Sequence, residues 1–147
     1  MNLFAWLNPS PLRVILLFTI LAVVYAAAVI DWQLSLAFGE SSATTTRALS
    51  NVWLFFLVLL PAAFIVYRIF HSPRLTLHFT AASILILFSG LEDILYFHAS
   101  GRPLPAELPW LSANPLVFLF GEPITAFTVT LSAFVWTLIA AYLLFRR

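Results

Sequence analysis

Four long apolar runs divide the sequence, and each has the length of a membrane-spanning helix. The runs cover Leu12–Trp32, Asn51–Phe70, Leu75–Phe97 and Pro123–Phe145. A helix pairs its backbone N–H and C=O groups internally, so about 20 apolar residues in helical form can cross the hydrocarbon of a bilayer. The runs do not alternate between apolar and polar positions, and they are roughly twice as long as a barrel strand. The pattern therefore predicts four transmembrane helices.

The segment between the third and fourth runs is neither a regular helix nor an ordinary polar loop. Residues 101–114 (GRPLPAELPWLSAN) combine three prolines with leucines and a tryptophan. We expect this segment to lie on the membrane surface or to fold over the helices as a lid. Residues 115–120 (PLVFLF) follow, and the pattern leaves open whether they re-enter the membrane. A break at Gly121 then puts Pro123 at the first position of the last helix, which proline favours.

The composition supports a membrane protein. Of the 147 residues, 63% are hydrophobic and 9% are charged, whereas a soluble domain has about half and about a quarter. We predict an all-α, polytopic integral membrane four-helix bundle with a proline-rich outer loop between helices 3 and 4. Residues 1–147 would form a single transmembrane domain. Pro61, in the middle of the second run, predicts a kink there.

Two residue types are missing from the sequence, and their absence excludes several kinds of chemistry. There is no cysteine, so disulfides, thiolate metal ligands and covalent haem attachment are excluded. There is no lysine either, because all seven cationic residues are arginine, and a retinal Schiff base is therefore impossible. The cofactor, if there is one, stays undetermined. The partner that the composition implies is the lipid bilayer, and not a nucleic acid.

The charges separate between the two ends of the predicted helices. If the four helices alternate in direction, five arginines lie on one side: Arg13, Arg68, Arg74, Arg146 and Arg147. Only Arg47 and Arg102 lie on the other side. The positive-inside rule then predicts that both termini are cytoplasmic. All six acids fall in the outer half: Asp31, Glu40, Glu92, Asp93, Glu107 and Glu122.

The third run ends with two adjacent acids, Glu92 and Asp93, which are the candidate catalytic residues. In a continuous helix they share one face with Ser89 and Tyr96, and the same stripe continues inward to His78. An ionised carboxylate at the bilayer centre costs about 2.5 to 3.5 kcal/mol, and less near the interface. We therefore expect this face to turn toward the other helices or a wet cavity.

Further polar residues at the same end complete a candidate ligand site. Glu122 begins the fourth helix, and it could meet Glu92 and Asp93 beneath the proline-rich lid. The predicted ligand-binding residues are Glu122, Tyr96, His98, Ser89 and Arg102, and Asp31 of the first run is a further contributor. If a metal binds, Glu92, Asp93 and Glu122 would suit a hard cation. The structural alternative is an interhelical hydrogen bond, or a salt bridge to Arg102 or Arg47.

Three functions fit these features. The first is a small membrane protein whose outward-facing carboxylate pocket binds a cation, a proton or a lipid-like ligand, with or without catalysis. The second is a structural or accessory subunit that packs its aromatic surface against other membrane subunits. The third is a small transporter or channel that acts as a homo-oligomer, because the four helices of one chain leave little room for a pore within a single molecule.

Overall fold

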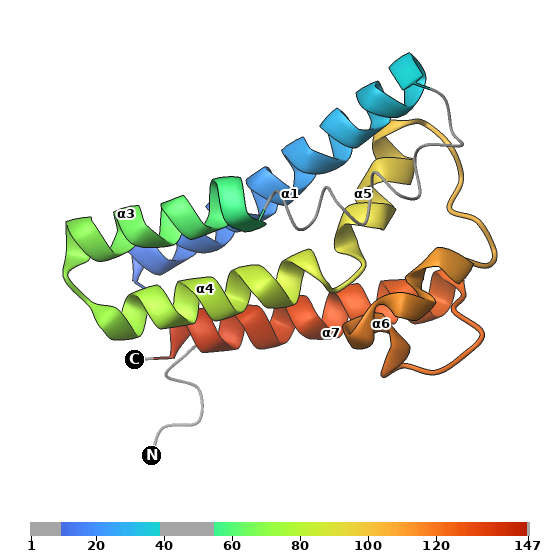
Figure 1. The fold of residues 1–147 in the computed structure, drawn as a ribbon. Coiled ribbons are helices and arrows are strands. Elements are labelled where there is room, and N and C mark those ends of the chain that lie inside the picture. Colours follow the sequence, from blue (N-terminus) through green and yellow to red (C-terminus); the bar gives the residue numbers. More distant parts are fainter. Residues whose placement is uncertain (1–9, 39–54, 147) are drawn as a thin grey trace.

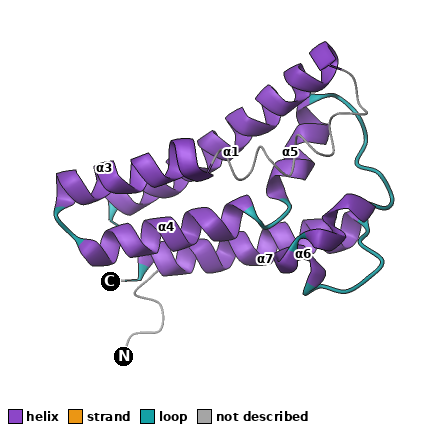
Figure 2. Cartoon of the chain, viewed as in Figure 1, coloured by secondary structure: helices purple, strands orange, loops and turns teal. Residues whose placement is uncertain are grey.

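The structure is a computed structural model that describes residues 10–38 and 55–146, and within these ranges the fold is all-α with no β-sheet (Figures 1 and 2). Six α-helices are present in this part: α1 (Pro11–Phe38), α3 (Leu60–Phe70), α4 (Pro73–Leu87), α5 (Leu91–Ala99), α6 (Pro115–Phe118) and α7 (Ala126–Phe145). A π-turn, η3 (Phe55–Leu59), leads into α3, and a 3₁₀ turn, η4 (Pro109–Ala113), precedes α6.

Within the described residues, two or three segments are long and apolar enough to cross a membrane. α1 and α7 are each a candidate span on their own, and α4 with α5 forms a third only if the bent pair counts as one span. The second predicted helix lies partly outside the described residues, and its described part, Phe56–Phe70, is a shorter apolar helix. The all-α membrane fold is thus supported, whereas the four-helix bundle is not confirmed.

Pro61 acts on α3 through its missing N–H and its ring. In a regular helix this ring would clash with the carbonyl group four residues earlier, at Leu57. The backbone is wound as the wider π-turn η3 at that point, and α3 starts with Pro61 in its first turn. The backbone is therefore irregular directly before Pro61, as a π-turn, whereas the kink expected at Pro61 stays a prediction.

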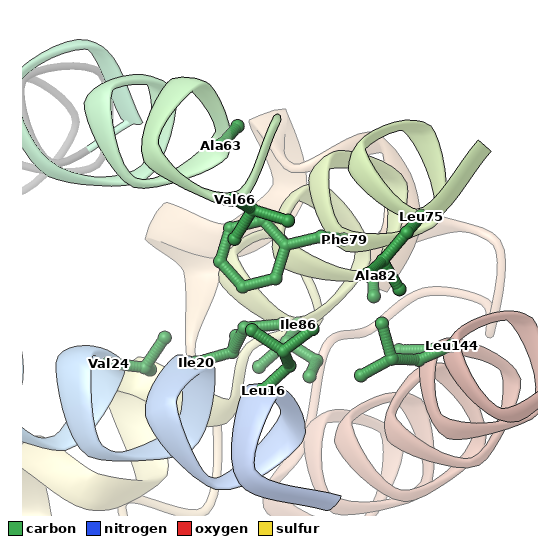
Figure 3. Packing of buried hydrophobic residues seen from close by; sticks show 11 residues of the cluster. Leu16, Ile20, Val24, Ala63, Val66, Leu75, Phe79, Ala82, Ile86 and Leu144 are labelled. Atoms are coloured by element: carbon green, nitrogen blue, oxygen red, sulfur yellow. The ribbon is translucent and has the colours of Figure 1, made fainter. Parts of the chain in front are cut away.

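The main core lies where α4 packs between α3 and α7, with α1 closing a further side (Figure 1). Figure 3 shows Leu16 and Ile20 of α1 meeting Phe79 and Ile86 of α4 and Leu144 of α7. Ile20, Ile86 and Leu144 have no exposed surface. Many residues on the outer faces of the helices are large and apolar, as lipid contact requires.

The start of α1 and the end of α7 lie at the same end of the molecule, beside the turn between α3 and α4 (Figure 1). The Arg13 guanidinium donates a hydrogen bond of 3.0 Å to the carbonyl oxygen of Leu144 and another to that of Arg146. Arg68 and Arg74 flank the nearby turn. Four arginines therefore gather at one end, as the charge pattern predicted, while the cytoplasmic location of this end stays a prediction.

The segment between α5 and α7 folds back onto the helices. Its buried residues Leu108, Leu111 and Val117 pack with Ile124 and Val129 in a second apolar cluster. Backbone hydrogen bonds join the two sides of this segment, with Leu108 N–H donating to the Ile124 oxygen at 2.9 Å. The prediction of a loop that folds over the helices is confirmed.

Candidate functional site

The helix break between α4 and α5 sets the position of the acidic residues. The sequence favoured one continuous helix over 75–97, and this expectation is wrong because the chain bends by 57° between α4 and α5. Gly90 adopts φ 86°, a left-handed conformation that glycine reaches without steric cost. A Cβ at Gly90 would lie 3.0 Å from Val129 Cγ1 of α7, so the backbone also approaches α7 closely at this point.

Hydroxyl groups satisfy backbone atoms that the break removes from the helix ladder. Ser89 Oγ accepts a hydrogen bond from Leu91 N–H at 3.2 Å and donates one to the Ile86 oxygen at 2.7 Å. Ser132 Oγ of α7 donates to the Ser89 carbonyl oxygen at 2.8 Å. Through this hydrogen bond, Ser132 holds the break between α4 and α5 against α7.

Glu92 and Asp93 occupy the first turn of α5 and are both buried, with 3% and 7% of their surface exposed. Ser89 and Tyr96, which lie close to these acids in the sequence, are also buried, with 0% and 3% of their surface exposed. The burial predicted for this face is therefore confirmed, although the stripe does not continue along a straight helix to His78. Negative side chains in a first turn also interact favourably with the positive end of the helix dipole.

Helix α1 supplies the opposite wall of this site. α5 packs against α1, and the two helices run in the same direction along the chain (Figure 1). The hydroxyl oxygens of Ser35 and Tyr96 lie 2.9 Å apart in a hydrogen bond across this interface. Asp31 is one helical turn before Ser35 and is itself buried. Likewise, Glu92 is one turn before Tyr96, so Asp31 and Glu92 each lie one turn before the hydrogen-bonded pair on their own helix.

The proline-rich segment contributes Trp110. Its indole N–H donates a hydrogen bond of 3.0 Å to Asp93 Oδ1. The Trp110 ring also lies beside Phe97, with 6.3 Å between the ring centroids. The folded-back segment therefore covers Asp93 from the side that α1 leaves open.

Glu122 lies apart from the buried acids. It is exposed, and together with Glu107 it lines an open depression of about 570 Å³ between Pro109 and Ile124. The expectation that Pro123 begins the last helix is wrong by three residues, because α7 begins at Ala126 with a capping box formed by Thr125 and Thr128. The structure therefore does not bring Glu122 into the group formed by Glu92 and Asp93.

The two remaining predicted residues lie near the outer end of α5. His98 is exposed in the last turn, and Arg102 is exposed just beyond it. In the described ranges 10–38 and 55–146, no group of three or more His, Cys, Asp or Glu side chains is arranged to hold a metal ion. The predicted metal ligands Glu92, Asp93 and Glu122 do not form such a group. The possible partner Arg47 lies outside the described residues.

Sequence reasoning did not assign Ser35 and Trp110 to the site. The spacing of Asp31 and Ser35, four residues apart on α1, repeats that of Glu92 and Tyr96 on α5. This repeat was a usable signal, because equal spacing on two parallel helices allows two successive contacts. No comparable signal marked Trp110, since its contact with Asp93 depends on how the segment after α5 folds.

No protein-family model, curated protein or solved structure matches the chain. The fold and the site define a class: a small all-α membrane protein with two or three candidate spans and buried carboxylates at Asp31, Glu92 and Asp93.

Proposed function

We propose that this protein binds protons within the membrane at a carboxylate site formed by Asp31, Glu92 and Asp93. The observation that carries the proposal is the burial of acids on two packed helices, α1 and α5, with Asp31 and Glu92 each one helical turn before the Ser35–Tyr96 hydrogen bond. Hydrocarbon strongly disfavours bare negative charge, so acids in such a place are neutralised by a proton, a cation or a basic side chain.

A proton fits this site better than a metal ion. Asp31 and Glu92 are both buried on the packed helices α1 and α5, and two carboxyl groups brought close together there would repel each other when both are ionised. One shared proton removes this repulsion and adds a hydrogen bond. Asp93 has a different role in the proposal: it accepts the Trp110 N–H and remains the ionised member of the site.

Infrared spectroscopy tests this proposal directly. In a purified sample in lipid nanodiscs, a protonated buried carboxylic acid gives a C=O stretching band that disappears as the pH is raised. We expect Asp31→Asn and Glu92→Gln each to remove this band. The exposed acid variant Glu107→Gln is the matched control and should leave the band unchanged.

Two outcomes would contradict the proposal. The first is a wild-type spectrum with no protonated-acid band at any pH at which the protein stays folded. The second is a band that appears only in Arg102→Gln, because that result would mean that an ion pair with Arg102 normally keeps the acids ionised.

A proton-coupled transporter is the second candidate, and the helix break favours it. Discontinuous membrane helices often place their half-helix ends at the sites of transported ions, and here the acids lie in the first turn after the break. In liposomes that hold a pH gradient and a trapped pH dye, the reconstituted wild-type protein should dissipate the gradient. Glu92→Gln should abolish this dissipation. If the gradient decays no faster than in empty liposomes, the protein binds protons but does not transport them.

A further inference from the structure

A second candidate site lies at the arginine end, far from the carboxylates. An open groove of about 640 Å³ runs between α3 and α4. Its walls come from Leu60, Pro61, Ala63, Phe64 and Tyr67 of α3, and from Thr76 and Thr80 of α4. A volume in this range is typical of ligand sites in proteins.

The groove is apolar even where its residues carry hydroxyl groups. Thr76 Oγ1 donates a hydrogen bond of 3.0 Å to the Ser72 carbonyl oxygen, and Thr80 Oγ1 donates one of 2.9 Å to that of Thr76. These bonds remain within α4, so the hydroxyl groups already have acceptors. Pro61 has no backbone N–H to offer. The walls therefore suit a hydrocarbon chain.

Positive charge lies beside one end of this groove. Arg68 is one helical turn after Phe64 on α3 and is exposed, and Arg74 is exposed in the first turn of α4. Arg13 and Arg146 lie at the same end of the molecule. Among the described residues, the acids Asp31, Glu92, Asp93, Glu107 and Glu122 all lie toward the opposite end, on the outer part of α1, on α5 or in the segment beyond it.

We infer that the groove holds one acyl chain of an anionic phospholipid, whose phosphate group binds Arg68. An acyl chain gains little by moving from bulk lipid to an apolar groove, because both surroundings are hydrocarbon. The headgroup therefore decides which lipid is retained, and basic residues at the membrane surface favour anionic lipids. The groove fixes the chain directly below the charges that attract its headgroup.

Native mass spectrometry of the delipidated protein tests this inference. The protein is titrated separately with phosphatidylglycerol and with phosphatidylcholine, and we expect one tightly held phosphatidylglycerol per chain. Arg68→Gln should weaken its binding about fivefold, as expected for one basic residue near an anionic surface. Thr80→Leu should fill the groove and weaken the binding of both lipids.

Arg146→Gln is the matched control. It removes the same charge at the same end, but from α7, which lies on the far side of α4 from α3 (Figure 1). Its effect on the single bound lipid should be less than twofold. An effect equal to that of Arg68→Gln would mean that the arginine end attracts anionic lipid generally, and would overturn the site.

A measurement on the wild-type protein covers the case in which a variant does not fold. A phosphatidylglycerol with a photoreactive acyl chain should crosslink to peptides containing residues 60–67 and 76–80. Crosslinks spread evenly over the apolar surface, equal retention of phosphatidylcholine, or a dimer that excludes lipid from these peptides would each overturn the inference. None of these results depends on the carboxylate site.

Discussion

At the scale of single residues, Gly90 makes the helix break possible. Its φ of 86° is strained for any other residue, and its backbone packs against the side chains of Val117 and Val129. Both conditions are set by the tertiary structure, so the sequence alone did not show how closely Gly90 approaches α7.

Gly90→Ala should therefore be more destabilising than another glycine substitution at positive φ. Gly101 has φ 67° and no atom within 4 Å of an added Cβ, so Gly101→Ala incurs only the backbone strain, about 1–2 kcal/mol. Gly90→Ala should cost about 1–3 kcal/mol more, because its Cβ would lie 3.0 Å from Val129 Cγ1. Unfolding in detergent measures both values, and equal losses would show that the contact with α7 has no energetic importance.

The Trp110–Asp93 hydrogen bond gives a second prediction at this scale. Trp110→Phe should destabilise the protein by about 1.5–3 kcal/mol, because it removes a hydrogen bond to a charged group. In the Asp93→Leu background the same change should cost less, since the acceptor is gone. The two changes should couple by about 1 kcal/mol in a double-mutant cycle. Strict additivity would mean that the Trp110–Asp93 hydrogen bond contributes nothing to stability.

Among the predicted site residues, those within one helical turn of Glu92 are buried as expected, while their role in a site stays a prediction. Asp93 and Tyr96 share α5 with Glu92, because this helix begins at Leu91, whereas Ser89 lies in the break before it. The start of the last helix was placed three residues too early, because α7 begins after the Thr125 and Thr128 capping box. Both threonines are visible in the sequence, but Pro123 was the stronger start signal by the usual rules.

At the scale of secondary-structure elements, the apolar runs predicted α1 and α7 well, and α4 with α5 less well. Apolar character reports that a segment avoids water, but it does not distinguish a straight helix from two helices joined at an angle. The adjacent Ser89 and Gly90 were the available sign, since serine–glycine pairs are among the common causes of sharp kinks. The break then depends on α7, which provides an external donor for the freed carbonyl group.

Ser132→Ala tests the connection between α7 and the break. It removes the hydrogen bond of 2.8 Å to the Ser89 carbonyl oxygen, and interhelical bonds of this kind in membranes contribute about 0.6–1.7 kcal/mol. The control is Thr130→Ala on the same helix, whose hydroxyl bonds only to the Ala126 oxygen. Thermal unfolding should show a loss for Ser132→Ala that clearly exceeds the control. If the two losses match, the break is held by packing alone.

At the scale of the whole molecule, the separation of charge predicts how the chain lies in the membrane. The start of α1, the turn before α4 and the end of α7 share the arginine end, and the segment between α5 and α7 lies at the acidic end (Figure 1). If these parts face the same side of the membrane, the chain crosses it an even number of times between the start of α1 and the turn before α4, so a second crossing besides α1 is needed there.

Cysteine labelling measures this topology without background, because the chain has no cysteine of its own. We expect Ser10→Cys and Ser72→Cys to react with an impermeant maleimide from the cytoplasmic side of the membrane. Ser112→Cys should react only from the opposite side. Labelling of Ser10→Cys and Ser72→Cys from different sides would contradict the shared arginine end and, with it, the proposed phospholipid site.

The hydrogen bonds from Arg13 to the end of α7 also constrain the order of assembly. Their donor lies on α1, and their acceptors, the Leu144 and Arg146 oxygens, lie 131 and 133 residues later in the chain. Once synthesised, α1 must therefore remain in the bilayer, in contact with lipid or with the insertion machinery, until α7 has also been synthesised. Insertion and folding of this protein are consequently separate events in time.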